Sequence, residues 1–265
     1  MNDTAETLHF SCTLCGKCCH DLKLPLSVSE SISWLRRGGV VQVLTEAMPW
    51  PVEPPADDGP AQHKRRRSFA ATSGNQPIRV IVTLAASFDG PCPHLRDDMR
   101  CGAYEARPRV CRIYPAEVNP YVKLMPAGKA CPPQAWTEQH PAFERAGRIL
   151  DDQTVEIIRQ SRDADAQDAS LKERFVALLG YTKAALSNEG FAVYTPQPAA
   201  AREALEAVAA QASRSSLDRV SSDWTFVSNQ RDTIEALVSI EARATADTKD
   251  DDGAFRYLGW RASNT

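Results

Sequence analysis

The sequence predicts an α+β protein that is mainly helical. A small, irregular, cysteine-rich domain with a short sheet is expected over residues 1–136, followed by a helical domain over residues 137–265. Two observations support this division. All eight cysteines precede residue 132. Beyond Trp136 the chain becomes rich in Ala, Glu, Arg and Leu, with apolar residues at the spacing of amphipathic helices.

The first elements of the cysteine-rich domain are short. Leu22–Leu26 should be extended, because Pro25 argues against a helix there. A short helix should follow, since Ser27 and Glu30 have the spacing of a capping box and Gly38 suits the helix end.

Two strands are expected next, at Val40–Leu44 and at Ile78–Leu84, where β-branched residues are most frequent. Between them, Pro49–Ser68 is rich in proline and polar residues and is predicted to be a mobile loop. The basic run His63–Arg67 could contact nucleic acid or another anionic partner. A solvated loop is the favoured interpretation, because no aromatic residues are interleaved to stack on bases.

The rest of the chain divides at Trp136. From Pro91 onward, frequent prolines predict turns and short helices with little periodic core, so a metal site would supply the missing constraint. After Trp136 we expect four or five amphipathic helices, packed on one another or on the front half. The clearest helical patterns are Leu171–Leu186, Ala201–Ala212 and Asp232–Ala242.

Composition and charge exclude several classes of protein. Hydrophobic residues make up 43% of the chain and charged residues 25%, which is ordinary for a globular protein. The net charge of −3 indicates no general attraction to nucleic acid or anionic membrane. No apolar run approaches the roughly 20 residues of a membrane helix, and Met1–Phe10 does not resemble a secretory signal. We therefore expect a cytoplasmic protein with no nucleic-acid or membrane partner; a protein partner could bind the helical C-terminal region.

The cysteines are the strongest functional signal. In the reducing cytoplasm, clustered cysteines more often bind metal or perform redox chemistry than form disulfides. Four of them fall within eight positions and overlap as C-x-x-C steps, an arrangement unusual for cysteines that merely pack in a core. The candidate metal ligands are Cys12, Cys15, Cys18, Cys19, Cys92, Cys101, Cys111 and Cys131.

The spacing of the cysteines favours iron–sulfur over zinc. Three thiols at C-x2-C-x2-C with a remote fourth cysteine before proline resemble the ligand spacing of a [4Fe–4S] site, whereas structural zinc prefers two separated C-x2-4-C pairs. Cys92 and Cys131 both precede proline, so either can be the remote ligand. Gly16 suits the left-handed backbone that such a turn often needs.

The adjacent pair Cys18 and Cys19 is not explained by a simple four-ligand centre. Side chains of neighbouring residues tend to diverge, so one of the two could ligate a second centre, stay free or act in redox chemistry. The eight thiols could therefore form two four-ligand sites, or one site with spare cysteines. For Cys92, Cys101 and Cys111, each taken alone, simple burial is a stronger alternative to metal binding than it is for the clustered cysteines.

Two long motifs in this order resemble the zinc- or iron-chelating cysteine-cluster family, the CxxCxxCC or YkgJ-like proteins. The first is C-T-L-C-G-K-C-C at Cys12–Cys19, and the second is C-G-A-Y-E-A-R-P-R-V-C-R-I-Y-P at Cys101–Pro115. Ala103 departs from the isoleucine that the family usually carries. The resemblance covers about residues 8–136. Two shorter matches are Pro91–Leu95 and Cys131–Pro133.

The resemblance implies metal binding, and some relatives are iron–sulfur proteins. A flagellin lysine N-methylase carries a related cluster, but no glycine-rich nucleotide loop is visible here, so the ligands are carried over and the methylation is not. We expect a cytoplasmic protein whose [4Fe–4S] centre has a structural or electron-transfer role, with zinc as the alternative metal. The other hypotheses are an enzyme that uses the cluster or a free thiol, and a zinc-stabilised interaction module.

Residues beside the cysteines are candidates for supporting roles. Arg107 and Arg112 flank Cys111 and could donate hydrogen bonds to cluster sulfur, or bind carbonyls and carboxylates in a turn-rich segment. Tyr104 and Tyr114 are interpreted as packing residues. Two further residues, His20 and His94, are interpreted as ordinary polar residues rather than ligands.

Overall fold

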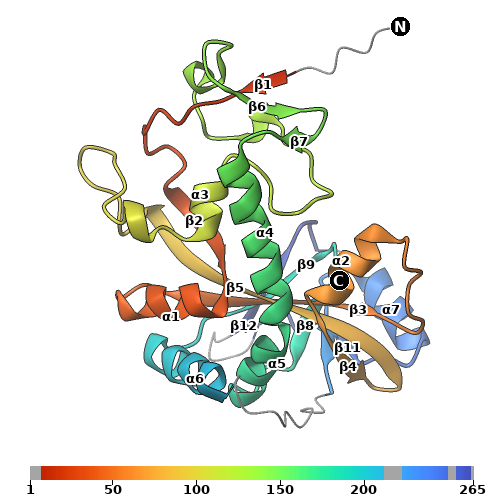
Figure 1. Ribbon diagram of the computed structural model, residues 1–265. Helices are drawn as coiled ribbons and strands as arrows, with labels where there is room; N and C mark the ends of the chain where they lie inside the picture. Colours follow the sequence, from red (N-terminus) through yellow and green to blue (C-terminus); the bar gives the residue numbers. More distant parts are fainter. Residues whose placement is uncertain (1–6, 212–222, 250–254, 264–265) are drawn as a thin grey trace, which may run out of the picture. The chain divides into compact units, whose positions relative to one another are not determined.

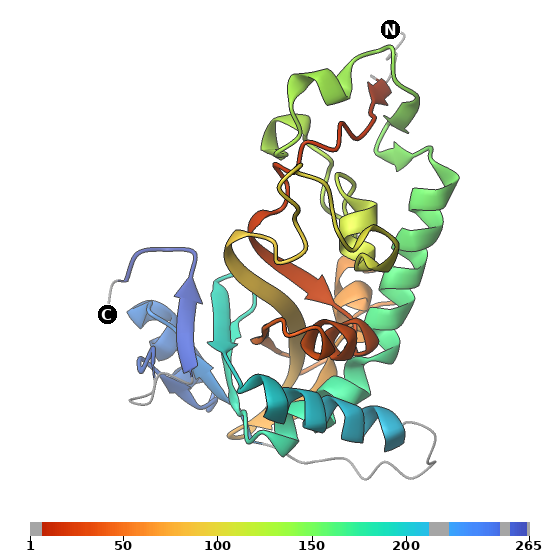
Figure 2. The same ribbon diagram turned by 90° about the vertical axis from the view of Figure 1, so that its left-hand side faces the viewer.

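The computed structural model describes residues 7–211, 223–249 and 255–263. The chain divides into two compact units, shown in two orientations in Figures 1 and 2. Unit 1 comprises Met1–Leu24 and Ser87–Ala164, and unit 2 comprises Pro25–Ala86 and Asp165–Thr265. No helix in the described residues is long and apolar enough to cross a membrane.

The prediction of a mainly helical protein is wrong. Helices account for 34% of the chain and strands for 29%, and the strands form a nine-stranded and a three-stranded sheet. The expected helical C-terminal region holds four helices in its described part, but also seven strands. These strands were missed because they are short, and because most of them pair with strands far away in the sequence, where periodicity gives no signal.

The larger sheet has the strand order β11-β10-β8-β3-β5-β2, with β4 paired to β5 and β9 paired to both β3 and β12. Strands β2 and β5 each run from one unit into the other. The strands are β2 (His20–Leu26), β3 (Val41–Pro49), β4 (Phe69–Ser73), β5 (Gln76–Pro91), β8 (Lys183–Leu186), β9 (Gly190–Tyr194), β10 (Thr225–Val227), β11 (Ala244–Thr245) and β12 (Phe255–Gly259).

The antiparallel pair β3–β5 lies at the centre of this sheet. Its register runs from Val41 opposite Ala86 to Pro49 opposite Ile78. β-Branched residues suit a pleated surface with both faces covered, and Val43 is fully buried here. The strands predicted at Val40–Leu44 and Ile78–Leu84 are therefore confirmed, and both extend further than expected.

Four helices of unit 2, α1, α5, α6 and α7, pack against this sheet or against one another. Helix α1 lies beside α6, α6 lies beside α5, and α7 contacts β10 and β11 (Figures 1 and 2). The capping box predicted at Ser27 and Glu30 is present and begins α1. The helices are α1 (Val28–Arg36), α2 (Gly59–Arg66), α5 (Ala169–Leu178), α6 (Pro198–Gln211) and α7 (Arg231–Ser239). Ala212, at the end of a predicted helix, lies outside the described residues.

Two segment predictions need correction. Pro49–Ser68 is not all loop, since α2 forms within it: the Asp58 side chain accepts a hydrogen bond from the Ala61 N–H at 3.0 Å, and proline lies in the first turn. The basic run therefore lies mainly on a helix. The helix predicted over Leu171–Leu186 ends at Leu178, where the chain turns and continues as β8.

Unit 1 contains the small sheet and most of the irregular structure. Strand β1 pairs with β6, which pairs with β7, and the three strands lie together in Figure 1. The remainder is the unit 1 ends of β2 and β5, the first thirteen residues of α4, and the turns and short helices expected from Pro91 onward. Its elements are β1 (Thr7–His9), β6 (Ala142–Arg145), β7 (Arg148–Ile149), α3 (Arg109–Ile113), α4 (Asp152–Gln167) and 3₁₀ turns at Tyr104–Ala106, Pro126–Gly128 and Pro133–Trp136.

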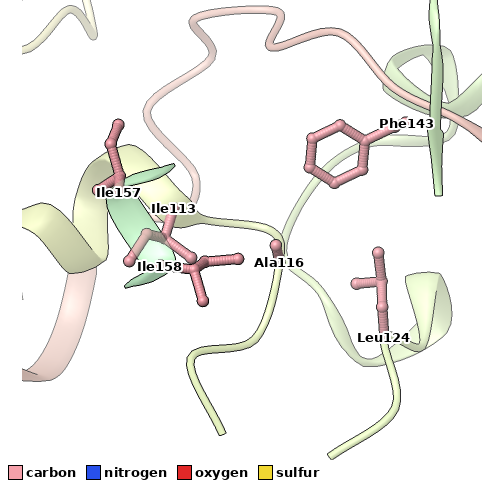
Figure 3. Packing of buried hydrophobic residues seen from close by; sticks show 6 residues of the cluster. All are labelled: Ile113, Ala116, Leu124, Phe143, Ile157 and Ile158. Atoms are coloured by element: carbon pink, nitrogen blue, oxygen red, sulfur yellow. The ribbon is translucent and has the colours of Figure 1, made fainter. Parts of the chain in front are cut away.

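A compact apolar core holds these pieces of unit 1 together. Phe10 packs on Trp136 with ring centroids 4.8 Å apart, and on Phe143 at 5.3 Å. Phe10 lies just before the first cysteine and Trp136 just after the last, so this core anchors both ends of the cysteine-bearing chain. Figure 3 shows its six buried members: Ile113, Ala116, Leu124, Phe143, Ile157 and Ile158.

Candidate metal centre

All eight cysteines lie in unit 1, seven of them outside its helices and strands. Four occupy the loop between β1 and β2, two follow β5, one is on α3 and one precedes the 3₁₀ turn Pro133–Trp136. All are free thiols; Cys12 is exposed and the other seven are partly buried. The fold therefore brings the whole predicted ligand set into one compact unit without a disulfide.

The first cysteine loop turns through left-handed backbone at two positions. Leu14 has φ 53° and Gly16 has φ 66°, as expected for Gly16 from the sequence. A Cβ added to Gly16 would meet the backbone oxygen of Met99 at 2.8 Å. The loop is closed by the Cys19 N–H, which donates to the Gly16 oxygen at 2.9 Å. Glycine is thus required here both by conformation and by the close approach of the later segment.

Backbone hydrogen bonds connect this loop to the next cysteines. The Cys92 N–H donates to the Cys19 oxygen at 2.8 Å. The following turn is closed by the Leu95 N–H, which donates to the Cys92 oxygen at 2.8 Å, and Leu95 forms a bridge with Cys101. Main-chain bonds therefore join Cys19 to the distant segment that contains Cys92 and Cys101, and side-chain changes alter such bonds little.

The adjacent cysteines do not diverge as expected. The sulfur atoms of Cys18 and Cys19 lie 4.0 Å apart, within hydrogen-bonding distance for sulfur. Burial first, and then the neighbouring Cys18, raise the pKa of Cys19 to about 12. Burial likewise raises the pKa of Cys18, with further contributions from Cys12 and Cys15.

The other thiols also influence one another. Burial raises the pKa of Cys111 to about 12, and the charges of Cys19 and Cys92 add to the effect. Burial also raises the pKa of Cys92. Burial of Cys15 acts to raise its pKa, but hydrogen bonds from the Lys17 backbone and the Thr13 side chain outweigh it and lower the pKa. Most of these thiols therefore favour the protonated form until a cation binds nearby.

Tyr114 contacts the last cysteine, a role that its interpretation as a packing residue missed. Its hydroxyl oxygen accepts a hydrogen bond from the Ala130 N–H at 2.7 Å. Burial raises the pKa of Cys131, while a hydrogen bond from the Tyr114 side chain acts to lower it. The signal available in the sequence was the position of Tyr114, three residues after Cys111.

The arginines predicted beside the cluster have different surroundings. Arg107 donates from Nε to the Tyr104 oxygen at 3.1 Å, and its guanidinium carbon lies 3.7 Å from the centroid of the Tyr104 ring. Arg112 is exposed, on α3. His20 and His94 are both partly buried. The cofactor-binding role of the two arginines stays a prediction.

The donor set fits a thiophilic metal in kind. Cysteine thiolates are the ligands of structural zinc sites and of [4Fe–4S] clusters. Unit 1 contains eight free cysteines from which such thiolates can form. Within the described residues, no group of three or more His, Cys, Asp or Glu side chains converges closely enough to hold an ion as the side chains stand. Binding would therefore require the cysteine side chains to rotate on a backbone that already connects their segments.

Comparison with known families agrees with the resemblance seen in the sequence. Residues 11–132 match a family model described as "Putative zinc- or iron-chelating domain", CxxCxxCC. The chain is therefore similar to this family over residues 11–132, the segment that we call the CxxCxxCC domain. This domain begins just before Cys12 and ends just after Cys131, so it contains every cysteine of the chain. No curated protein and no solved structure matches the chain.

Proposed function

We propose that the CxxCxxCC domain holds a [4Fe–4S] centre with a structural or electron-transfer role in the cytoplasm. The observation that carries this proposal is the run of Cys12, Cys15 and Cys18 at three-residue steps on one loop, with Cys131 and its following proline in the same compact unit. This combination of three close thiols and a remote cysteine before proline is typical of [4Fe–4S] ligation. When bound, the cluster would supply a one-electron redox centre and a cross-link between distant segments.

The chain's own residues would prepare this site. The left-handed turn at Gly16 shapes the loop, and the core around Phe10 and Trp136 anchors the first and last cysteine segments. Tyr114 orients the segment of Cys131. These contacts reduce the conformational entropy that metal binding would otherwise have to offset. A protein partner for residues 137–265 stays a prediction.

Anaerobic purification of the full chain tests the proposal. We expect a brown protein with broad visible absorbance and equal amounts of iron and acid-labile sulfide. Cys15→Ser should lose metal and lower the melting temperature of unit 1, whereas the neighbouring change Ser11→Ala should preserve both. A colourless protein with stoichiometric zinc would refute the iron–sulfur proposal and support a zinc-stabilised module. A protein that binds neither metal would refute metal binding itself.

A further inference from the structure

We propose that Cys18 and Cys19 are a redox-active pair, which a small disulfide oxidant converts reversibly into a disulfide between adjacent residues. The pair itself goes beyond the proposed metal centre, and only its competition with metal binding rests on the proposed function. The observation that carries the inference is the 4.0 Å separation of the two sulfur atoms. Because sulfur atoms in a disulfide are about 2.05 Å apart, closing the pair requires them to approach by only about 2 Å.

Main-chain hydrogen bonds hold the backbone at this pair. The Cys19 N–H donates to the Gly16 oxygen at 2.9 Å, and the Cys19 oxygen accepts from the Cys92 N–H at 2.8 Å. Both cysteines of the pair are free thiols and only partly buried, as the approach of a small oxidant requires. The backbone can therefore stay in place while the two side chains close.

The adjacency of the two residues makes such a disulfide easy to reduce. Neighbouring Cα atoms are about 3.8 Å apart across a trans peptide, whereas disulfide-bonded residues usually have Cα atoms about 4.4–6.8 Å apart. A disulfide closed below this range stores strain, and strained disulfides are labile and regulatory rather than structural. Transient disulfides that sense redox conditions are also the kind found in a reducing compartment.

Oxidised glutathione is an oxidant that balances the reaction. The thiolate of one cysteine attacks a sulfur atom of the oxidant and displaces one glutathione thiolate, which leaves a mixed disulfide. The sulfur of the second cysteine then attacks the protein sulfur of that mixed disulfide and displaces the second glutathione. Two electrons and two protons pass from the pair to two glutathione thiols. Only one cysteine loses its proton at a time and the product is neutral, so two adjacent thiolates never form.

Oxidation and metal binding compete for the same sulfur atoms. Cys18 and Cys19 belong to the predicted ligand set, and the thiolate is the form of cysteine that binds metal. A disulfide at the pair would remove two donors, and metal bound there would protect the pair from oxidation. The pair would thus make metal loading sensitive to the thiol–disulfide balance of the surroundings.

Tryptic peptide mapping of the full chain tests where the disulfide forms. Metal-free reduced protein is incubated with oxidised glutathione, the remaining thiols are alkylated, and the peptides are analysed by mass spectrometry. Cleavage after Lys17 and Lys23 isolates the pair in the peptide Cys18–Lys23, apart from every other cysteine. We expect this peptide to resist alkylation and to have lost two hydrogen atoms. Excess reduced glutathione should restore both thiols.

Other maps would overturn the inference. Two peptides cross-linked through Cys18 or Cys19, for example to Cys15, would show that the pair is wrong, and so would full alkylation of both cysteines. Among the variants, Cys19→Ser should stop at a mixed disulfide with glutathione on Cys18. Cys12→Ser, which leaves the pair intact, should still form the disulfide, and its loss there would contradict the assignment.

Zinc content separates this inference from the proposed function. Zinc bound by the wild-type chain is measured by elemental analysis in the reduced protein, after oxidation and after renewed reduction. We expect less zinc in the oxidised protein, recovery on reduction, and a reduced peptide Cys18–Lys23 when zinc is added before the oxidant. Equal zinc content in both forms would overturn the competition. Reduced protein that binds neither zinc nor iron would refute the proposed function, and the peptide map would still decide whether the pair forms a disulfide.

Discussion

Replacing Gly16 with alanine tests whether the first cysteine loop depends on this glycine. Gly16 has φ 66°, where a residue with a Cβ costs about 1–2 kcal/mol. The added Cβ would also lie 2.8 Å from the Met99 backbone oxygen and 3.1 Å from Leu95 Cδ1. Since a backbone atom yields less readily than a side chain, we add about 1–2 kcal/mol for the overlap, as for other overpacked positions. Gly16→Ala should therefore lower the free energy of unfolding of unit 1 by about 2–4 kcal/mol.

Gly147→Ala is the matched control for this change. Gly147 lies in the hairpin between β6 and β7 of the same unit with φ 79°, and an added Cβ there meets nothing within 4 Å. It carries the conformational cost alone, about 1–2 kcal/mol. Denaturant unfolding of both metal-loaded variants, together with metal content, measures the difference. Equal losses of stability, or a Gly16→Ala protein with wild-type stability and metal content, would refute the argument from close approach.

Three further predictions concern individual contacts. Tyr114→Phe removes the hydroxyl bonded to Ala130 and should destabilise unit 1 by about 1–2 kcal/mol in denaturant unfolding; an unchanged midpoint would contradict this role. Ile113→Ala should cost about 2–5 kcal/mol because the side chain is 1% exposed, and Ile113→Val under half of that; similar losses for both would argue against a packed core at this position. Asp165→Asn should destabilise unit 2 by about 3–5 kcal/mol at pH 7, because Lys172, with its side chain 3% exposed, loses its partner at 2.5 Å. Burial acts to raise the pKa of Asp165, but the attraction of Lys172 outweighs burial and the net pKa is lowered. The stabilisation from this pair is therefore complete above the unfolded pKa of about 4, and it is lost as the pH falls through the folded pKa. The wild-type and variant proteins should thus converge in stability in strong acid, and a constant difference down to pH 2 would contradict this.

Local signals in the sequence predicted local structure well. The capping box at Ser27 and Glu30 begins α1, and the β-branched run at Ile78–Leu84 lies in β5. Both depend on interactions between residues close in the chain or on side-chain shape. The helix α2 was missed because Asp58 and Pro60 are turn residues as well as helix-start residues, and composition cannot separate these uses.

Non-local pairing accounts for most of what the sequence did not predict. Strand β8 lies parallel to β3, with Glu46 opposite Ala185. These two residues are far apart in the sequence, and the periodicity of side chains within a strand does not indicate which distant strand it pairs with. The same limit applies to the candidate site. The motifs identified all eight cysteines, but they left Cys92 and Cys131 as equal candidates for the remote ligand of the first loop, because both precede proline.

The adjacent cysteines place a physical demand on the folded domain. Two thiolates at the 4.0 Å separation of Cys18 and Cys19 would repel by about 4 kcal/mol at an effective dielectric constant of 20, so the metal-free pair stays protonated at neutral pH. The core of unit 1 is small, so its packing has little stability in reserve against such a charge pair. A cation beside each sulfur would replace this repulsion with attraction and would cross-link the segments that the core only anchors at their ends. Both sulfur atoms of the pair can therefore become thiolates only when a cation binds beside them, which couples the charge of Cys18 and Cys19 to metal binding.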